Sequence, residues 1–441
     1  MNWSSTLRAN GFYKYFSGII DYLLKHSDIT IHYVTSDPND HIFTTDIPRI
    51  CPWFIDNRDL IAFFMKLDAD LVLMTTPDLD RYHLKRSIVR DDVEYVYLDH
   101  GMSSFHLMLQ EGALDHFDTV FAYGPNHIAE LRQTEAAYGL PQKTIVKTGF
   151  GLLDELLVRV AALAKEVQPE ADGTSGEGRS KNPQSRRLME KADTAPESPI
   201  CAVAPDAATT SVLAPATAPA ILTSAKKQIL IAPSWQQDNI MDLCLDELLS
   251  ALLKQPNLKI VLRPHPEYVK RFAERMAALL VSYQEKLGPD FVIETDFAAN
   301  ETVYRSDLVI TDWSTTAMEF SYATKRPSLF INTPMKMMNP NYQRIEAIPL
   351  DISLRERLGQ SVEVTELASI PAVIAQLTSN SGAWTEKITA IVDETIYDVG
   401  DGSRSGAEYL ISRISYQREL RAWYKSLRPA PNTQARVGAS A

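Results

Sequence analysis

The sequence predicts an α/β fold of two doubly wound domains that face each other. Short β-branched or aromatic runs alternate with longer helical patterns on both sides of a compositional break. Such alternation indicates parallel sheets covered by helices on both faces. A last helical pattern at residues 383–424 is available to cross back to the first domain. In such sheets a ligand binds beyond the carboxyl ends of the strands.

The first domain is predicted over residues 1–164. Its helical pattern at residues 11–26 comes before any apolar strand. An α/β domain normally opens with a strand, so the prediction leaves open whether this domain lacks its first one. The predicted strands are residues 29–35, 70–75, 94–98, 119–122 and 144–148, and the later helical patterns are 57–67, 126–138 and 149–164.

Residues 165–226 differ in composition from the rest of the chain. These 62 residues contain no Phe, Trp or Tyr and hold 7 of the 25 prolines. Because such a segment buries too little apolar surface to offset the entropy of ordering, we expect a disordered linker or insertion rich in Ala, Pro, Ser and Thr. The alternative is a poorly patterned third domain.

The α/β rhythm restarts in a second domain, predicted over residues 227–426 and followed by a disordered basic tail at 427–441. The predicted strands are residues 228–232, 258–262, 291–294, 308–311 and 328–331, and the helices are 241–254, 267–287 and 383–424.

Composition narrows the function classes. The 44 Lys and Arg against 56 Asp and Glu give a net charge of −12, which argues against a broad nucleic-acid surface. The three widely spaced cysteines exclude a disulfide framework and fit a reducing cytoplasm. The sequence contains no run of 18 uninterrupted apolar residues, so no transmembrane helix is predicted.

The first chemical motif follows the strand predicted at residues 94–98. Asp99, His100 and Gly101 stand at its carboxyl end. Imidazole can take a proton near neutral pH, and glycine permits a tight turn or a close approach of substrate. His100 is therefore a candidate general base, and the alternative is a hydrogen-bonded loop histidine.

The second motif, Arg263-Pro264-His265-Pro266, follows the strand at residues 258–262. Two prolines stiffen the turn, while Arg263 offers a fork of donors and a protonated His265 a second positive charge. This combination favours anion binding. Alternatively, the segment is only a helix entry with Pro266 at the first position.

The third motif places Asp312, Ser314, Thr315 and Thr316 between a buried strand and an apolar helix. The free N–H groups and dipole of that helix start, together with three hydroxyls, can hold phosphate. Thr316 and Glu319 also match the capping-box spacing, so N-capping alone is the alternative.

A fourth turn, Pro233-Ser234-Trp235, ends the strand at residues 228–232 and could face the same cleft or be a packed turn. No metal site is predicted: Asp78 and Asp80 form too short a motif, and His100 and His106 have no third ligand nearby.

The four turns together resemble the CDP-glycerol glycerophosphotransferase family of teichoic-acid-type polymerases and primases. The family motifs His-Gly, Pro-Thr-Trp, Arg-Pro-His-Pro and Asp-Tyr-Ser-Ser are matched by His100-Gly101, Pro233-Ser234-Trp235, Arg263-Pro264-His265-Pro266 and Asp312-Trp313-Ser314-Thr315. Gly149–Asp154 and Asp401-Gly402 also look like family landmarks. The resemblance covers most of the chain outside residues 165–226 and the tail.

The resemblance implies a GT-B-like fold, with two facing Rossmann-like domains, a cleft between them and a C-terminal crossing helix. It implies that His100 is the general base and that Arg263 and His265 bind the donor phosphates and steady CMP. Ser314, Thr315 and Thr316 would cradle phosphate. The wider donor-binding set is Arg263, Ser314, Thr315, Thr316, Asp312, Ser234 and Trp235.

The implied reaction moves glycerol phosphate, or a related polyol phosphate, from a CDP-activated donor to a hydroxyl of a cell-surface polymer or lipid-linked acceptor, releasing CMP. No cofactor is required, because the nucleotide donor is a substrate, and no metal is evident. Two alternatives stay open: a GT-B glycosyltransferase that uses a nucleotide sugar in capsule or lipopolysaccharide synthesis, and a non-catalytic nucleotide-binding protein. The sequence after His-Gly departs from the family's Lys-bearing pattern, which leaves the acceptor open.

The C-terminal region is basic. Residues 411–441 contain six basic residues and one acid, Glu419. The basic residues are Arg413, Arg418, Arg421, Lys425, Arg428 and Arg436. With Trp423 and Tyr424 among them, this region could lie on the inner face of the cell membrane. Alternatively, the helix packs back on the first domain. The expected location is cytoplasmic, with peripheral membrane contact under the first interpretation.

Overall fold

The computed structural model describes residues 13–167, 226–297 and 301–427. The predicted linker at 165–226 and the predicted tail at 427–441 lie almost wholly outside these ranges, and so do the first 12 residues, which precede the predicted first helix. Residues on both sides of 165–225 belong to one compact unit. Within it we call residues 13–164 with the last helix the first lobe, and residues 226–395 the second lobe.

The second lobe is a six-stranded parallel sheet with strand order β12-β11-β10-β7-β8-β9. Numbered within the lobe, this is the doubly wound order 3-2-1-4-5-6 read from the other edge. Its strands are β7 (Lys227–Ile231), β8 (Leu258–Leu262), β9 (Phe291–Ile293), β10 (Leu308–Thr311), β11 (Ser328–Asn332) and β12 (Gly359–Glu363).

Alternate side chains of this sheet enter two different hydrophobic cores. Ile229, Ile231, Ile260 and Leu262 belong to the outer core, whereas Leu230 and its neighbours on β8, β10 and β11 face the other way. Burial on both faces explains why the four central strands read as continuous apolar runs.

The first lobe contains two separate parallel sheets. One pairs β1 (Ile31–Thr35) with β2 (Ile50–Phe54), and the other has the order β3-β4-β5-β6. The latter strands are β3 (Leu71–Met74), β4 (Glu94–Leu98), β5 (Thr119–Ala122) and β6 (Thr144–Lys147). The two sheets and the doubly wound second lobe confirm the predicted α/β class with two Rossmann-like domains.

Helices connect the strands. Those of the first lobe are α1 (Tyr13–His26), α2 (Leu60–Met65), α3 (Phe105–Met108), α4 (Pro125–Tyr138), α5 (Gly151–Val167) and the returning α16 (Gly402–Leu427). Those of the second are α6 (Ile240–Leu243), α7 (Leu245–Leu252), α8 (Pro266–Arg271), α9 (Ala273–Tyr283), α10 (Glu301–Arg305), α11 (Thr316–Thr324), α12 (Leu350–Ser353), α13 (Arg355–Leu358), α14 (Ile370–Leu377) and α15 (Ser381–Thr395). Short 3₁₀ turns are η2 (His41–Thr44), η3 (Gln284–Lys286), η4 (Tyr342–Arg344) and η5 (Val364–Ser369).

Three helix predictions were wrong in length. The helix expected at 241–254 is broken at Cys244, whose φ of −150° and ψ of 10° separate α6 from α7. The helix expected at 267–287 is broken at Phe272, whose φ of −122° and ψ of 47° interrupt the helical hydrogen bonding between α8 and α9. The helix expected at 383–424 is two helices, because residues 396–401 carry the chain from α15 to α16.

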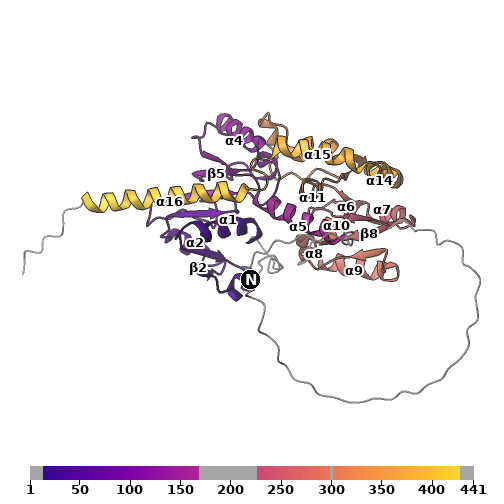
Figure 1. Cartoon of the computed structure of the whole chain (residues 1–441), viewed down its shortest axis with the longest axis horizontal. Helices are drawn as coiled ribbons and strands as arrows, with labels where there is room; N and C mark the ends of the chain where they lie inside the picture. The colour runs from indigo at the N-terminus through magenta and orange to yellow at the C-terminus, as the bar shows by residue number, and fades with distance from the viewer. Residues whose placement is uncertain (1–12, 168–225, 298–300, 428–441) are drawn as a thin grey trace, which may run out of the picture. The chain divides into compact units, whose positions relative to one another are not determined.

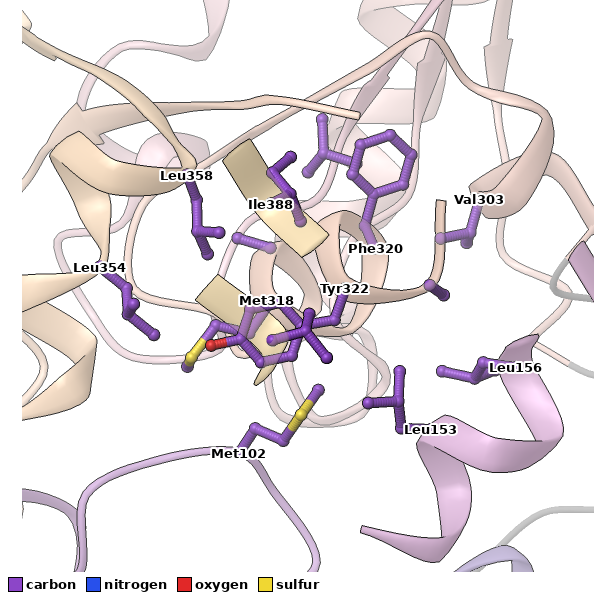
Figure 2. Close-up of a cluster of buried hydrophobic side chains, with 14 of the residues drawn as sticks. Met102, Leu153, Leu156, Val303, Met318, Phe320, Tyr322, Leu354, Leu358 and Ile388 are labelled. Carbon is purple, nitrogen blue, oxygen red and sulfur yellow. The ribbon is translucent and has the colours of Figure 1, made fainter. Parts of the chain in front are cut away.

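A shared hydrophobic core joins the two lobes. Met102, Leu153 and Leu156 of the first lobe belong to the same buried cluster as Met318 and Phe320 of the second. Figure 2 shows α5 presenting its leucines toward the side chains of α11. Burying an aliphatic side chain contributes about 1.5–3 kcal/mol, so this cluster opposes separation of the lobes.

The last helix returns to the first lobe, as the predicted crossing helix requires. Figure 1 shows α16 running alongside α1. Ala407, Leu410 and Ile414 of α16 complete a core with Ile19 and Phe121.

Three of the arginines considered for membrane contact form ion pairs within this lobe. Arg413 pairs with the buried Glu94, Arg418 with Asp70, and Arg421 with Asp70 and Asp92. For these three the structure favours the packed-helix interpretation. Within the described residues no helix has the length and apolar character needed to span a membrane.

The return of the chain is fixed at the two family landmarks named above. Asp154 accepts hydrogen bonds from the N–H groups of Gly400 (2.6 Å) and Gly402 (2.8 Å). Gly149 has a φ of +65°, and a side chain there would collide with the carbonyl oxygen of Tyr397. These residues hold the entrance of α16 against the start of α5.

We predict that Asp154→Ala lowers the free energy of unfolding by about 1–3 kcal/mol, because two backbone donors lose their acceptor. Chemical denaturation of the full chain measures this. Asp393→Ala, which removes an exposed carboxylate of α15, is the control and should change stability by less than about 0.5 kcal/mol. Equal effects of the two substitutions would contradict the role of Asp154.

Candidate active site

Three of the four sequence motifs lie at one edge of the second-lobe sheet. The strands β7 and β10 are neighbours, and the turns beginning at Pro233 and Asp312 follow their carboxyl ends. Arg263 follows β8, the neighbour of β7 on the other side. The chain leaves β7 and β10 toward opposite edges of the sheet, so a crevice is expected between their ends.

Asp312 holds this edge together. Its buried carboxylate accepts hydrogen bonds from the backbone N–H groups of Ser234 (2.8 Å), Trp313 (2.6 Å) and Ile240 (3.1 Å). Sequence reasoning assigned Asp312 to the donor-binding set. The structure gives its carboxylate a positioning role, because both oxygens are occupied by the chain itself.

The Pro233-Ser234-Trp235 turn offers one hydroxyl and one ring. Ser234 is buried, and its Oγ has no hydrogen-bond partner among the described residues. The ring of Trp235 lies 4.8 Å from the guanidinium of Arg271 and 5.2 Å from the ammonium of Lys336. A turn with an unsatisfied buried hydroxyl, and with two cations against its tryptophan ring, suits a polar, anionic ligand.

The hydroxyl cluster forms the start of α11. Thr315 is the N-cap residue, and the Oγ of Ser314 accepts a hydrogen bond from the Thr316 N–H (3.3 Å). The capping box expected between Thr316 and Glu319 is wrong, because Thr316 is already the first helical residue. The positive end of the nine-residue helix can still attract an anion.

The base candidate of the first lobe lies against this hydroxyl cluster. A methyl group at position 101 would lie 3.6 Å from Cγ2 of Thr315, so the His100-Gly101 turn packs on the start of α11. This short gap shows that the first motif lies close to the third, across the two lobes. Glycine at position 101 leaves this approach open.

His100 is held in its neutral form. Its ring lies edge-on to Tyr15, with 5.9 Å between ring centroids. Burial lowers the pKa of His100 below its usual 6.5; a hydrogen bond with the Thr75 backbone partly offsets this, while Lys14 and Lys336 lower the pKa further. A neutral imidazole is the form that accepts a proton.

Asp99 supports the turn rather than the imidazole. Its Oδ1 accepts a hydrogen bond from the His100 backbone N–H (2.8 Å), whereas Nδ1 of His100 lies 3.8 Å from that oxygen. The second distance is too long for a hydrogen bond. Burial raises the pKa of Asp99 to about 8, although the His100 and Gly101 backbone N–H groups favour its charged form.

His265 is a neutral donor in this structure. Its Nδ1 accepts a hydrogen bond from the Glu267 N–H (3.1 Å) and so caps α8, which leaves the proton of the neutral ring on Nε2. Burial lowers the pKa of His265 to about 4, and Lys336 and Lys14 act in the same direction. In this structure His265 therefore offers an N–H rather than the second positive charge that the sequence suggested.

Arg263 is engaged by its own lobe. Its guanidinium pairs with Glu294 (2.7 Å), which also accepts a hydrogen bond from Thr302, and lies over the ring of Phe297. Its side chain is only 10% exposed. The structure therefore places the guanidinium of the motif between β8 and β9, paired with a carboxylate.

Two lysines that sequence reasoning missed lie near both histidines. Lys14 comes from α1, and Lys336 from the loop after β11. Each lowers the pKa of both His100 and His265, which means that each charge is close to both rings. Neither lysine belongs to a recognisable sequence motif, so their position near the histidines becomes visible only in the folded structure.

Part of the chain matches a known protein family. Residues 217–342 match the model of the CDP-glycerol:poly(glycerophosphate) glycerophosphotransferase family. The match confirms the resemblance drawn from the three motifs of the second lobe and supports a transferase; the His100-Gly101 motif lies outside the matched residues. It contains the Pro233, Arg263 and Asp312 motifs and also Lys336, and it ends within η4.

Several solved structures are similar to the chain at low identity. A UDP-GlcNAc 2-epimerase from Methanocaldococcus jannaschii, in complex with UDP-GlcNAc and UDP, is 12% identical with a TM-score of 0.48, covering 86% of this chain and 96% of its own. A putative UDP-N-acetylglucosamine 2-epimerase from Listeria monocytogenes is 12% identical with a TM-score of 0.49, covering 92% and 94%. A glycosyltransferase from Rickettsia africae is 11% identical with a TM-score of 0.45, covering 91% and 94%. No curated protein sequence matches the chain.

The short motif of Asp78 and Asp80, considered above as a metal site, consists of loop residues. Asp78 and Asp80 both have positive φ angles, and Asp78 pairs with Arg81 at 3.1 Å, as expected for loop residues. The described residues hold no cluster of three or more His, Cys, Asp or Glu side chains that could bind a metal ion.

We predict that Asp99→Asn removes a pH-dependent loss of stability. The folded pKa of about 8 lies above the usual value of 3.8, so the folded state holds a proton that the unfolded state releases. The free energy of unfolding therefore falls as pH rises from about 4 to about 8. The thermal midpoint of Asp99→Asn minus that of the wild type should therefore increase as the pH rises from about 4 to about 8.

Asp91→Asn serves as the control, since Asp91 is exposed. Parallel curves of thermal midpoint against pH for Asp99→Asn and the wild type would contradict the raised pKa.

Proposed function

We propose that the chain transfers glycerol phosphate, or a related polyol phosphate, from a CDP-activated donor to an acceptor hydroxyl and releases CMP. The closeness of Gly101 to Thr315 carries this proposal, because it brings the candidate base His100 near the candidate anion site at the start of α11. The family match over residues 217–342 supports the donor class. The acceptor in this proposal is a polymer or lipid-linked hydroxyl.

In the proposed reaction, neutral His100 takes the proton of the acceptor hydroxyl. The resulting oxygen attacks the phosphorus that bears the glycerol, and the bond between that phosphorus and the CMP oxygen breaks. A hydroxyl is a poor nucleophile at neutral pH, so a positioned base supplies about 100- to 10,000-fold of the rate. The proton ends on His100 and the negative charge on CMP.

The second lobe would stabilise the departing charge. Nε2–H of His265, the backbone N–H groups of the first turn of α11 and the hydroxyl of Thr316, which accepts from Ser314, offer donors. Donors fixed before the reaction stabilise developing phosphate charge without reorganising. Asp312 acts indirectly, because it holds the Ser234 and Trp313 turns in place.

Two other functions give different products in the same assay. A nucleotide-sugar glycosyltransferase would release UDP or another nucleoside diphosphate from its donor, and a non-catalytic binding protein would bind CDP-glycerol without turnover. CMP release from CDP-glycerol, with a polyol phosphate acceptor present, indicates the proposed transferase. Release of a nucleoside diphosphate from a nucleotide sugar, without CMP, indicates the glycosyltransferase, and binding of CDP-glycerol without turnover indicates the binding protein.

We predict that His100→Ala lowers CMP release by about 100- to 10,000-fold, because the acceptor hydroxyl loses its base. His265→Ala should lower it by about 100- to 1,000-fold, because a phosphate donor is lost. Both variants should keep the wild-type thermal midpoint within a few degrees. His83→Ala, an exposed histidine of the same lobe as His100, is the matched control. Wild-type turnover by either site variant would overturn the proposal.

We predict that kcat/KM rises with pH and reaches half its maximum below pH 6.5. The pKa of His100 is lowered by burial and by Lys14 and Lys336, and only its neutral form accepts the proton. A pH series of initial rates of CMP release measures this. A half-maximal point above 6.5 would argue against His100 as the base.

A further inference from the structure

The loop between β11 and η4 carries one cation into the crevice. Lys336 is half-buried on this loop, and its ammonium lies 5.2 Å from the centre of the Trp235 ring. Burial lowers the pKa of Lys336, while Asp351 and Asp312 favour its charged form. Within the described residues the ammonium forms no ion pair shorter than 4.0 Å.

Both lobes hold this loop in place. The N–H groups of Met338 and Asn339 donate to the carbonyl oxygen of Leu107 in α3, at 3.0 and 3.2 Å. The side-chain amide of Asn339 donates to the His106 carbonyl at 2.9 Å. α3 closely follows the His100-Gly101 turn, so the base and the cation are anchored on one segment.

The second lobe anchors the start of the same loop. The indole N–H of Trp313 donates to the Thr333 carbonyl (2.9 Å), and the amide of Gln236 donates to the Pro334 carbonyl (2.9 Å). These two donors come from the turns after β10 and β7, which form the crevice. The backbone around Lys336 is therefore fixed relative to both walls of the site.

Arg263 of the Arg263-Pro264-His265-Pro266 motif, unlike Lys336, already has a carboxylate partner. Arg263 has Glu294 at 2.7 Å and is 10% exposed, so an incoming phosphate would compete with a carboxylate for it. Lys336 has no such competitor within ion-pair distance. A half-buried ammonium without a paired carboxylate is unfavourable unless an anion completes it.

Resting on the proposed function, we propose that Lys336 is the cation that binds the diphosphate of the donor, and that Arg263 supports the turn. The ammonium of Lys336 lies 5.2 Å from the centre of the Trp235 ring, and its charge lowers the pKa of both histidines. Its charge would neutralise the diphosphate during binding and transfer.

Binding of inorganic pyrophosphate and of CDP to the full chain, measured by calorimetry, tests this. Lys336→Gln should raise the dissociation constant for both by about tenfold or more, because a charge-assisted contact is lost. Lys336→Arg keeps the positive charge and should restore most of the affinity. Cytidine has no phosphate, and its affinity should be the same for Lys336→Gln and the wild type.

Lys387→Gln is the matched control. Lys387 also lies over a tryptophan ring, with 4.5 Å to the centre of Trp384, but it is exposed on α15. This substitution removes a lysine–tryptophan contact of the same kind outside the crevice. Pyrophosphate binding should remain at the wild-type level.

A second readout is the pH profile of CMP release. The charged groups that act on the histidines are Lys14, Lys336, Asp99 and Glu267. Lys336→Gln removes one of the two cations that lower both pKa values, so the half-maximal point should move to higher pH. Lys336→Arg keeps the charge and should leave this point near its wild-type position.

Each outcome decides the proposal. Wild-type pyrophosphate affinity in Lys336→Gln overturns it, as does an equal loss of cytidine affinity. If Lys336→Gln fails to fold, Lys336→Arg decides: pyrophosphate affinity near the wild-type value supports the charge, and loss of affinity overturns it. Failure of the transferase function alone would appear as pyrophosphate binding that depends on Lys336 without CMP release from CDP-glycerol.

Discussion

The arrangement of the site depends on one buried carboxylate. Asp312 accepts three backbone N–H groups from two turns that are more than 70 residues apart in the sequence. A carboxylate that accepts several backbone donors forms charge-assisted bonds, which are stronger than neutral ones. By closing the turns after β7 and β10 onto each other, Asp312 sets the positions of Ser234, Trp235 and the start of α11. The groups proposed to bind phosphate therefore owe their geometry to a residue whose own oxygen atoms are occupied by backbone donors.

The shared apolar core extends this constraint to the first lobe. Interfaces between domains are often polar and allow relative motion. Here the leucines of α5 and Met102 pack among side chains of α11 and its neighbours, so His100 is carried on a lobe that is firmly seated. The distance between base and anion site is thus set mainly by packing. Polar bonds such as that from the Ser104 N–H to Asp351 (2.8 Å) then fix the orientation of the turn.

The sequence predicted the features that local patterns encode. The strands β4, β5, β8 and β10 have the predicted bounds, because their apolar runs are buried on both faces. The strands β2 and β12 were missed. Both are edge strands, one containing Pro52 and the other mostly polar, and their pairing comes from a neighbour rather than from their own pattern. The motifs placed His100 and His265 at strand ends, but their charge states, the pairing of Arg263 and the presence of Lys336 depend on tertiary contacts.

The return of α16 has a consequence for biosynthesis. The first lobe buries Ile19, Val96 and Phe121 against side chains that appear more than 280 residues later in the chain. During synthesis on a ribosome, the sheets of the first lobe emerge first, but their core is incomplete until α16 emerges. All six strands of the second lobe have emerged before α16 does. Closing so long a loop delays the contact, and the exposed apolar face meanwhile favours association with other chains. The order of synthesis is thus the reverse of the order in which the lobes can be completed.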